Sequence, residues 1–284
     1  MDIAIVTYAG MPQLYPLDAP LVPALRALGM NAQPVIWDDP SVDWSRFGAA
    51  VVRNAWDSHL RREEFIAWAD RVGAVTRLFN PAEVLTWNTH KGYLKTLEAR
   101  GLPLTPTVWV APGGTLDVAA VARERGWDAV VLKPAVAAGG LKVFIFRREQ
   151  WHDASAKVAE LAKEGDVMVQ PYLTAFETEG ERSYIFFNGD FSHAVRRPPT
   201  LASAPRGFAE PTGFTPDNAE EREIAHAVME ASGGRRLLYA RVDMATDNAG
   251  KPRLQEVEVT EPCLFLTLDA GAPERMARAV IARL

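Results

Sequence analysis

The chain has 284 residues, of which 48% are hydrophobic, and a formal net charge of −5 at pH 7. This length allows a large core and two domains, and the negative charge argues against nucleic-acid binding. Cys263 is the single cysteine, which excludes an internal disulfide and a cysteine-rich zinc site and indicates a reducing, cytoplasmic compartment. No apolar run reaches the length needed to cross a bilayer, so no membrane association is expected.

Short apolar runs and helical patterns alternate over the first part of the chain. Apolar runs at 3–7, 34–37 and 49–52 predict buried strands, and the apolar spacing within 20–29 and 61–73 predicts helices. Strands that alternate with helices indicate a parallel sheet covered on both faces. The sequence therefore predicts an α/β unit at its N-terminal end.

The remaining sequence mixes helices with paired strands. In chain order we predict a helix from near Asn88 to Gly101, two strands joined by a Gly/Ala loop over 129–146, a helix over 154–165, a strand at 167–173, a hairpin that turns at Asn188-Gly189, a proline-rich loop over 198–216, a helix over 220–234, a second hairpin over 237–262 and a final helix.

The second hairpin carries an unusual row of charges. A simple antiparallel register places Asp243 opposite Glu256 and Arg241 opposite Glu258, with Glu256 and Glu258 on one face. Opposed carboxylates repel each other unless a cation lies between them, and magnesium prefers oxygen ligands of this kind. The alternative is the solvated outer face of an edge hairpin, with Arg241 paired to Glu258.

A lysine at the end of an apolar strand precedes a glycine-rich loop in VVLKPAVAAGG. Backbone N–H groups of such a loop bind phosphate oxygens, and Lys133 would add a positive charge, although this is not a Walker motif. The alternative is an ordinary hairpin with a flexible tip. Lys91 and Lys95 lie four residues apart on the helix predicted after Asn88, where a solvated surface is the favoured interpretation for Lys95.

Taken in order, these features resemble an ATP-grasp enzyme over essentially the whole chain. A parallel-sheet domain is followed by a helix with Lys91, by VLKP with its flap, by VQPYL, by ERSYIFF and by the carboxylate hairpin. EVEVTEP is similar to the EINVTSP-type segment of bacterial glutathione synthetases. The segments WDDPSVDWSRF, VVRNAWD and REEFIAWADRV look most like the branch that contains the cyclo-ligase of D-cycloserine biosynthesis.

The resemblance implies a fold and a division into domains. The fold class would be α/β, with α+β character in the ATP-grasp part. A parallel-sheet domain at 1–83 would precede an ATP-grasp domain at 84–284, whose mobile lid subdomain would span about 104–170.

The resemblance also implies ATP and Mg²⁺ as cofactors, with two metal ions. The nucleotide-binding residues would be Lys91, Lys133, Ala138, Gly139, Gly140, Gln170, Pro171, Tyr172, Leu173 and Glu181, with Glu177 as a second candidate for the ribose acid. Arg241 and Lys133 would be catalytic, and Asp243, Glu256 and Glu258 would hold the metal. Because Glu258 replaces the asparagine of the related segment, it could bind metal directly or pair with Arg241.

The chemistry implied is the activation of a carboxylate by ATP, through an acyl phosphate that an amine or other nitrogen nucleophile then attacks. The substrate would be small and amino-acid-like, and the attack could be intramolecular. We expect substrate contacts from residues 15–18 and 53–57 and from Arg196 and Arg206, although either arginine could equally be a surface residue. A non-catalytic nucleotide-binding regulatory protein and a kinase-like enzyme are the alternatives. The substrate, the nucleophile and any homo-oligomeric state stay open.

Overall fold

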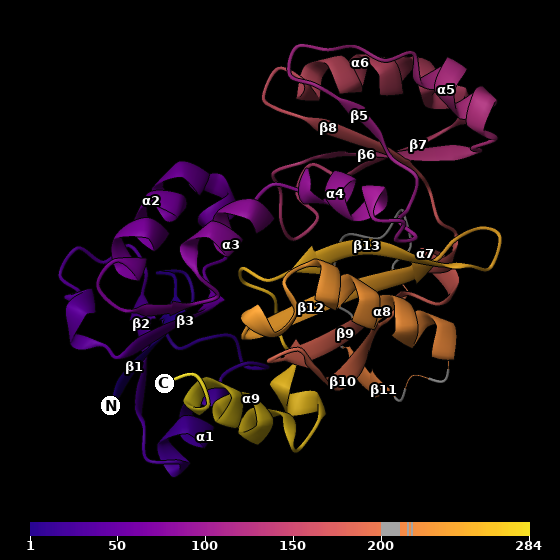
Figure 1. Ribbon diagram of the computed structural model, residues 1–284. Coiled ribbons are helices and arrows are strands. Elements are labelled where there is room, and N and C mark those ends of the chain that lie inside the picture. The colour runs from indigo at the N-terminus through magenta and orange to yellow at the C-terminus, as the bar shows by residue number, and fades with distance from the viewer. Residues whose placement is uncertain (200–210, 215, 217) are drawn as a thin grey trace.

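Three β-sheets organise the described part of the chain, and each is built from a different stretch of sequence (Figure 1). The computed structural model describes residues 1–199, 211–214, 216 and 218–284. The sheets have the strand orders β2-β1-β3-β4, β5-β8-β6-β7 and β11-β10-β9-β12-β13. We call the second one the lid sheet.

The strands are β1 Asp2–Thr7, β2 Asn31–Ile36, β3 Ala49–Asn54, β4 Arg77–Phe79, β5 Val108–Val110, β6 Ala129–Pro134, β7 Phe144–Arg147, β8 Val167–Pro171, β9 Glu181–Phe187, β10 Asp190–Arg197, β11 Thr212–Phe214, β12 Tyr239–Thr246 and β13 Pro252–Glu258. The α-helices are α1 Leu21–Ala27, α2 Arg62–Gly73, α3 Ala82–Asn88, α4 Tyr93–Ala99, α5 Val118–Arg125, α6 Trp151–Leu161, α7 Ala175–Thr178, α8 Ala219–Ala231 and α9 Ala272–Ile281. Short 3₁₀ helices lie at Trp44–Arg46, Ser58–Leu60, Arg148–Gln150, Gly234–Arg236 and Leu266–Leu268.

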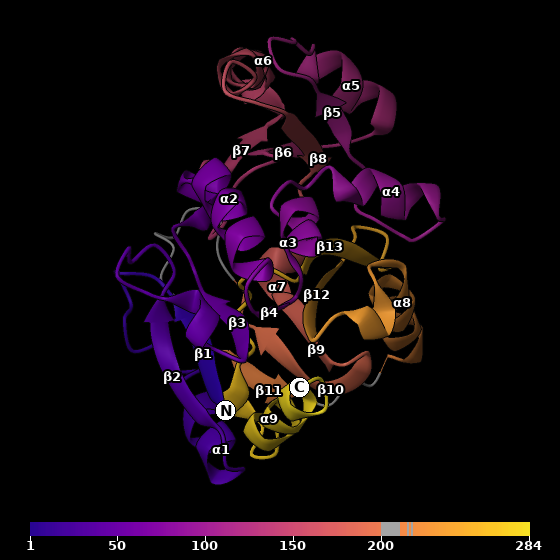
Figure 2. The same ribbon diagram turned by 60° about the vertical axis from the view of Figure 1, so that its left-hand side comes forward.

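The N-terminal sheet is parallel and buried on both faces, as predicted. Side chains alternate along β1, so Ile3 and Ile5 pack on the side of α1 while Ala4 and Val6 pack on the side of α2. Helix α9, from the other end of the chain, lies beside α1 and closes the first side in both views (Figures 1 and 2). The N-terminal unit therefore shares its core with the C-terminal helix.

The predicted helix from Asn88 to Gly101 is wrong in its boundaries. Helix α3 ends at Asn88, α4 begins at Tyr93, and Lys91 lies in the break between them. The Asn88 side-chain amide donates to the Val257 carbonyl at 2.7 Å and accepts from the Val259 N–H at 2.9 Å, so it bonds to the free edge of β13. The chain leaves the helix after Asn88, which places Lys91 beside that strand.

Lys95 lies on α4, so it does not share a helical face with Lys91. Its Nζ atom is 4.5 Å from the ring centroid of Trp109 at the start of the lid sheet. A cation over an indole ring is favourable by roughly 0.5–1 kcal/mol at an exposed site. Lys95 therefore contacts the lid sheet rather than solvent alone.

Most other predicted elements are present. The first hairpin turns at Asn188-Gly189, whose φ angles of 52° and 89° are those that asparagine and glycine tolerate best in a tight turn. Residues 129–146 form the antiparallel pair β6–β7 in the lid sheet, which α5 and α6 cover on its outer side at the top of Figure 1. Part of the predicted 198–216 loop lies outside the described residues, and its residues 212–214 form β11. Within the described part of the chain, no helix is both long and apolar enough to cross a membrane.

Candidate active site

The carboxylate hairpin has the predicted pairs. Asp243 lies opposite Glu256 and Arg241 opposite Glu258 in the antiparallel pairing of β12 and β13. The register shifts between Asp243 and Met244, because Gln255 is an extra residue in β13. The bulge was not predicted, but it lies nearer the turn than the four charged residues and leaves their pairing as expected.

Cations of the chain itself balance the two opposed carboxylates, Asp243 and Glu256. Asp243 accepts hydrogen bonds from Arg241 at 2.8 and 2.9 Å and from Ser183 Oγ at 2.7 Å, and it forms an ion pair with Arg197 Nη2 at 2.9 Å. Burial raises the pKa of Asp243, but the charges of Arg197 and Arg241 outweigh burial and hold it below its ordinary value. Asp243 is therefore a paired carboxylate.

Glu256 is also paired, with a lysine from outside the hairpin. Lys91 Nζ lies 2.6 Å from Glu256 Oε1 and donates to the Ala137 carbonyl at 2.8 Å. Burial lowers the pKa of Lys91, but the charge and hydrogen bond of Glu256, together with the charges of Glu258 and Glu261, outweigh burial and raise the pKa. Lys91 thus connects the carboxylate hairpin to the loop that follows β6.

Arg241 donates to Glu258 as well as to Asp243, and the guanidinium is 5% exposed. The surface-hairpin alternative predicted the pairing of Arg241 with Glu258. Its other assumption, that this face of the hairpin is solvated, is wrong. The charged face of the hairpin points into the protein, under the loops of the lid sheet and the N-terminal sheet.

Arg197 was missed in the sequence, where Arg196 was named instead. Arg197 pairs with Glu181 across β9 and β10, and its Nη2 also contacts Asp243. Neighbouring residues of a strand point to opposite faces, so Arg196 points away and donates to the Glu179 carbonyl at 2.7 Å. Counting outward from the Asn188-Gly189 turn pairs Glu181 with Arg196, and only the extra residue Ser192 in β10 moves Arg197 opposite Glu181, so simple alternation in the sequence did not reveal this pair. Arg206 lies outside the described residues.

Two carboxylates in this site have raised pKa values. Burial raises the pKa of Glu181 to about 7 against the opposing charge of Arg197, and the charge of Asp243 adds to the rise. Burial likewise raises the pKa of Glu258 to about 7 against the charge of Arg241, with Glu256 adding to the rise. The carboxylates are therefore crowded together in a way that an added cation would relieve.

Lys133 ends β6 of the lid sheet and faces the same site. No ion pair of Lys133 exists within the described residues, and burial lowers its pKa while the charge of Glu256 opposes that shift. The Lys133 side chain is half-buried, and an ammonium group in such a position without a carboxylate partner is ready to bind an anion. Among the described residues, the ion pairs of Lys91 and Arg241 are already made, so Lys133 differs from both.

The predicted phosphate loop follows Lys133. Gly139 and Gly140 have φ angles of 57° and 69°, a region that glycine enters without strain, and the Leu141 N–H donates to the Ala138 carbonyl at 3.0 Å. Lys142, just beyond, pairs with Glu164. The turn is short and lies directly after the Lys91 contact at Ala137.

The predicted adenine-binding residues lie where β8 leaves the lid sheet. Gln170 Nε2 donates to Thr107 Oγ1 at 2.8 Å, so its amide is already held on the lid side. The Tyr172 N–H donates to the Ala129 carbonyl of the lid sheet at 2.8 Å, and the Tyr172 carbonyl accepts from the Asn248 side-chain amide at 3.0 Å in the turn after β12. Within the described residues the Leu173 N–H makes no hydrogen bond. Pro171 precedes them as the last residue of β8, and Glu177 accepts from the Tyr172 hydroxyl at 2.8 Å.

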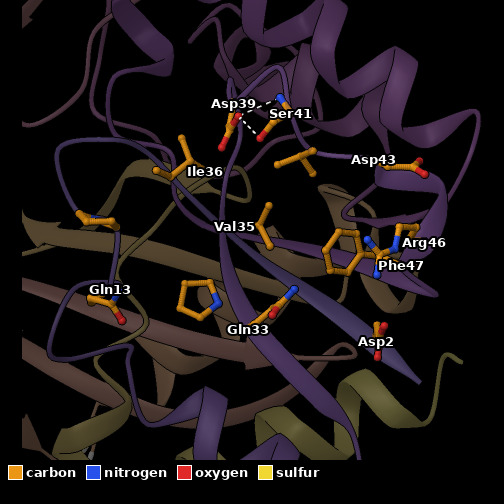
Figure 3. A pocket seen from close by; sticks show the side chains of 13 residues that line it. Asp2, Gln13, Gln33, Val35, Ile36, Asp39, Ser41, Asp43, Arg46 and Phe47 are labelled. Atoms are coloured by element: carbon orange, nitrogen blue, oxygen red, sulfur yellow. Dashed lines mark hydrogen bonds between the residues drawn. The ribbon is translucent and has the colours of Figure 1, made fainter.

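Two cavities lie elsewhere in the described part of the chain. One of about 440 Å³ is lined by β2 and the loop after it, including Gln33, Asp39 and Arg46 (Figure 3). A second of about 300 Å³ lies around Arg77 and Arg283. Neither contains a residue predicted for the active site. The described residues also contain no group of three or more His, Cys, Asp or Glu side chains arranged to hold a metal by themselves.

Comparison with known proteins agrees with this geometry. Residues 105–271 match the family described as the ATP-grasp domain of prokaryotic glutathione synthetase, and residues 3–80 match the N-terminal domain of D-cycloserine synthetase DcsG. The chain therefore belongs to the ATP-grasp ligases, as the resemblance implied. Enzymes of this class use ATP and Mg²⁺.

Within that class, the chain resembles one protein over its full length. It is 35% identical to "Cycloserine biosynthesis protein DcsG" of Streptomyces lavendulae, with 99% of this chain and 98% of that protein aligned. The crystal structure of D-cycloserine synthetase DcsG superimposes with a TM-score of 0.87 and 33% identity, covering 100% of this chain and 99% of the other.

More distant ATP-grasp structures share the fold. A RimK domain protein from Sphaerobacter thermophilus has a TM-score of 0.71 at 18% identity, covering 98% of this chain and 99% of the other. A D-alanine–D-alanine ligase from Bacillus anthracis has a TM-score of 0.70 at 15% identity, covering 99% and 96%. The α/β fold class, with a parallel N-terminal sheet before an ATP-grasp part, is thereby confirmed.

Proposed function

We propose that this ligase is a cyclo-ligase: ATP activates the carboxylate of an O-substituted serine, and a nitrogen on the side-chain oxygen of the same molecule closes the ring. The full-length similarity to D-cycloserine synthetase carries this proposal, because it includes the N-terminal domain that lies beside the site. D-Cycloserine is the cyclic amide that such a closure produces. A cytoplasmic location, a homo-oligomeric state, the domain boundary at 83/84 and a lid at 104–170 remain predictions.

Lys133 and Lys91 support binding of the ATP phosphates. Lys133 is a half-buried cation without an ion pair in the described part of the chain, and Lys91 lies between the phosphate loop and Glu256. The backbone of Ala138, Gly139 and Gly140 would close over the triphosphate. Gln170, Pro171, Tyr172 and Leu173 would hold the adenine where the lid sheet meets the third sheet, with Glu181 on the ribose.

The Mg²⁺ would be held by Glu256 and Glu258, with Asp243 as a third ligand. These residues offer the carboxylate oxygens that magnesium prefers, but the three described side chains are not grouped to hold a metal by themselves, so phosphate and water would complete the coordination. The raised pKa of Glu258 indicates that the carboxylates around it are not fully balanced by cations of the chain, which supports binding of a metal cation there. We propose two ions, which would neutralise charge on the phosphates during transfer.

The chain's own residues would mainly position charges. The substrate carboxylate oxygen would attack the γ-phosphorus, forming an acyl phosphate and releasing ADP. The nitrogen would then attack the acyl carbon, expelling phosphate and losing a proton to form the amide. Arg241, fixed by Asp243 and Glu258, would stabilise the transferring phosphoryl group, together with Lys133. The loop at 137–140 would exclude water from the acyl phosphate.

The test is an assay of ADP and phosphate release against D- and L-serines whose side-chain oxygen carries a free or an acylated nitrogen. We expect ATP-dependent release of both ADP and phosphate with a D-serine derivative. By mass, the compound with a free nitrogen should give D-cycloserine, and the compound with an acylated nitrogen should give N-acyl-cycloserine, or D-cycloserine together with the acyl group released to water. A product whose mass shows that a second, separate amine has been joined to the carboxylate would indicate ligation between two molecules instead of cyclisation. ADP release without phosphate would indicate a kinase, and no release with any compound would overturn the proposal.

A further inference from the structure

Glu261 stands where the carboxylate hairpin meets the N-terminal sheet. Its backbone carbonyl accepts a hydrogen bond from Trp56 Nε1 at 3.0 Å, and its Oε1 accepts one from Ser58 Oγ at 3.4 Å. Trp56 and Ser58 follow the carboxyl end of β3. The side chain of Glu261 is half-buried, three residues beyond Glu258. It therefore lies between the proposed phosphate-transfer centre and the loops of the N-terminal sheet.

The carboxylate of Glu261 makes no ion pair with any residue that the structure describes; the Ser58 hydroxyl, at long range, is its hydrogen-bond partner. Burial, and then the charge of Glu258, raises the pKa of Glu261 to about 8. The charge of Lys91 opposes this rise without reversing it. A half-buried carboxyl group without a cation is the expected partner of a positively charged ligand.

Two of the neighbouring cations are already bound to carboxylates, and the third, Arg53, makes no ion pair in the described part of the chain and leaves Nε and Nη1 without a hydrogen bond. Lys91 is paired with Glu256, and Arg241 is held by its own strand neighbours. Arg53, which is fully buried, donates to the Pro262 carbonyl at 2.6 Å and stacks over the Tyr239 ring at 4.2 Å. None of these cations is placed to pair with Glu261, so the missing charge would come from a ligand.

An aromatic pair lies beside this carboxylate. Tyr15 and Trp56, both half-buried, have ring centroids 5.0 Å apart at an interplanar angle of 55°. The Tyr15 backbone N–H is fixed by Asn54 Oδ1 at 3.0 Å, and the indole N–H of Trp56 donates to the backbone carbonyl of Glu261. Aromatic faces favour an ammonium group and the carbons attached to it. The pair therefore provides a second feature suited to an organic cation.

The segment after Glu261 is rigidly held by side chains from distant elements. The Cys263 carbonyl accepts from Arg241 Nη1 at 3.2 Å, and the Leu264 N–H donates to Asp18 Oδ1 at 2.9 Å. The His193 ring donates to the Leu264 carbonyl at 2.9 Å. These bonds fix the backbone on which Glu261 stands, and a fixed site loses little entropy when a ligand binds.

We propose that Glu261 binds the α-ammonium group of the substrate and selects α-amino acids over analogues without that group. This inference rests on the proposed ligase function, in which the carboxylate of the same molecule faces Arg241. An ammonium group next to Glu261 would also stabilise the ionised carboxylate in its half-buried position. The EINVTSP-type segment has serine here, so this carboxylate is not needed for the shared phosphate chemistry.

The test compares Glu261→Gln with wild type on two matched probes: β-aminooxy-D-alanine and 3-aminooxypropanoic acid, which lacks only the α-amino group. Turnover is followed by ADP release, and binding of D-cycloserine in the presence of Mg-ADP is measured by calorimetry. We expect Glu261→Gln to lower kcat/KM for the amino acid by about 10- to 100-fold, mostly through KM, because a hydrogen bond to a charged group is lost. D-Cycloserine binding should weaken similarly, while the des-amino probe should change by less than about threefold.

Three controls separate the possible results. Glu98→Gln, at an exposed helical position, should match wild type; Glu261→Asp should restore part of the discrimination; and Mg-ADP binding should be unchanged in Glu261→Gln. If wild type turns over the amino acid or binds D-cycloserine, and Glu261→Gln still distinguishes the amino acid from the des-amino probe as well as wild type does, the inference about Glu261 is overturned while the proposed function stands. An equal loss on both probes overturns it too, because it indicates a structural or proton-transfer role. Wild type that neither turns over a serine derivative nor binds D-cycloserine overturns the proposed function and this inference together.

Discussion

Lys91 Nζ and Glu256 Oε1 lie 2.6 Å apart, and this contact joins the break between α3 and α4 to the carboxylate hairpin. The same ammonium donates to the Ala137 carbonyl at 2.8 Å. One lysine therefore links a proposed metal ligand to the loop proposed to cover the phosphates. In this structure, the charge that balances Glu256 comes from the chain itself.

Glu256→Gln should therefore lower the stability of the nucleotide-free protein. The buried ammonium of Lys91 would lose its charged partner, which costs about 1–3 kcal/mol when the pair is not fully enclosed. The variant should also gain less from Mg-ADP, because ligand-induced stabilisation follows affinity. Thermal melts with and without Mg-ADP measure both effects. An undiminished Mg-ADP shift would reject Glu256 as a metal ligand, and an unchanged melting temperature would reject the structural role of the pair.

Lys133→Met should leave the fold as stable as wild type, or slightly more stable. Burial lowers the pKa of Lys133, and no ion pair within the described residues is lost with it. ATP-dependent turnover should fall by about 100-fold or more, because a charge that stabilises the transferring phosphoryl group is removed. ADP release and urea unfolding are the measurements, with the exposed Lys163→Met as the control. Turnover within about threefold of wild type would remove Lys133 from the catalytic set.

Arg197→Met should be far more damaging than the neighbouring Arg196→Met. Arg197 holds Glu181 and Asp243, whose carboxylates would be left buried with one cation fewer, while Arg196 bonds to a backbone carbonyl on the other face. We expect Arg197→Met to lose about 1–3 kcal/mol of stability and at least about tenfold in turnover. Arg196→Met should remain within about threefold of wild type. Equal effects of the two substitutions would contradict the strand geometry.

Mg-ADP should slow hydrogen exchange over residues 136–140. This loop contains small residues, and its backbone N–H groups would bond to phosphate oxygens when nucleotide is present. The turn at Asn188-Gly189, far along the chain, serves as an internal control and should not change. Exchange mass spectrometry of both segments checks the prediction, and identical exchange at 136–140 with and without Mg-ADP would leave the loop without a phosphate-binding role.

His193 should make the protein less stable in mild acid. Burial lowers the pKa of His193 to about 4 from its ordinary 6.5, so the unfolded chain binds a proton that the folded chain does not. Stability from this group is complete above pH 6.5 and is lost as the pH falls toward 4, by about 3 kcal/mol over the interval. His193→Gln should flatten that decline, because glutamine has no group that titrates in this range. Its amide keeps a donor for the Leu264 carbonyl, so the fold should be retained. Urea unfolding of both proteins at pH 7 and pH 4.5 would show it, and parallel declines would exclude His193 as the cause.

The sequence by itself determined the elements and the local order of the charges. Period-two and helical patterns identified the buried strands and the main helices, and counting outward from the 247–251 turn placed Asp243 opposite Glu256. These are short-range relations, because a strand alternates and a hairpin pairs through neighbours along the chain. The resemblance to ATP-grasp ligases needed only the order of such segments, which the sequence contains in full.

Only the tertiary structure decided which charges meet. Lys91 reaches Glu256 because α3 ends at Asn88, whose side chain bonds to β13, and Arg197 rather than Arg196 reaches Asp243 because of the β9–β10 register. These contacts join segments far apart in sequence, and burial decides their energetics. In a low-dielectric interior a carboxylate depends strongly on the cation that the fold brings to it, whereas the sequence records only how many charges there are.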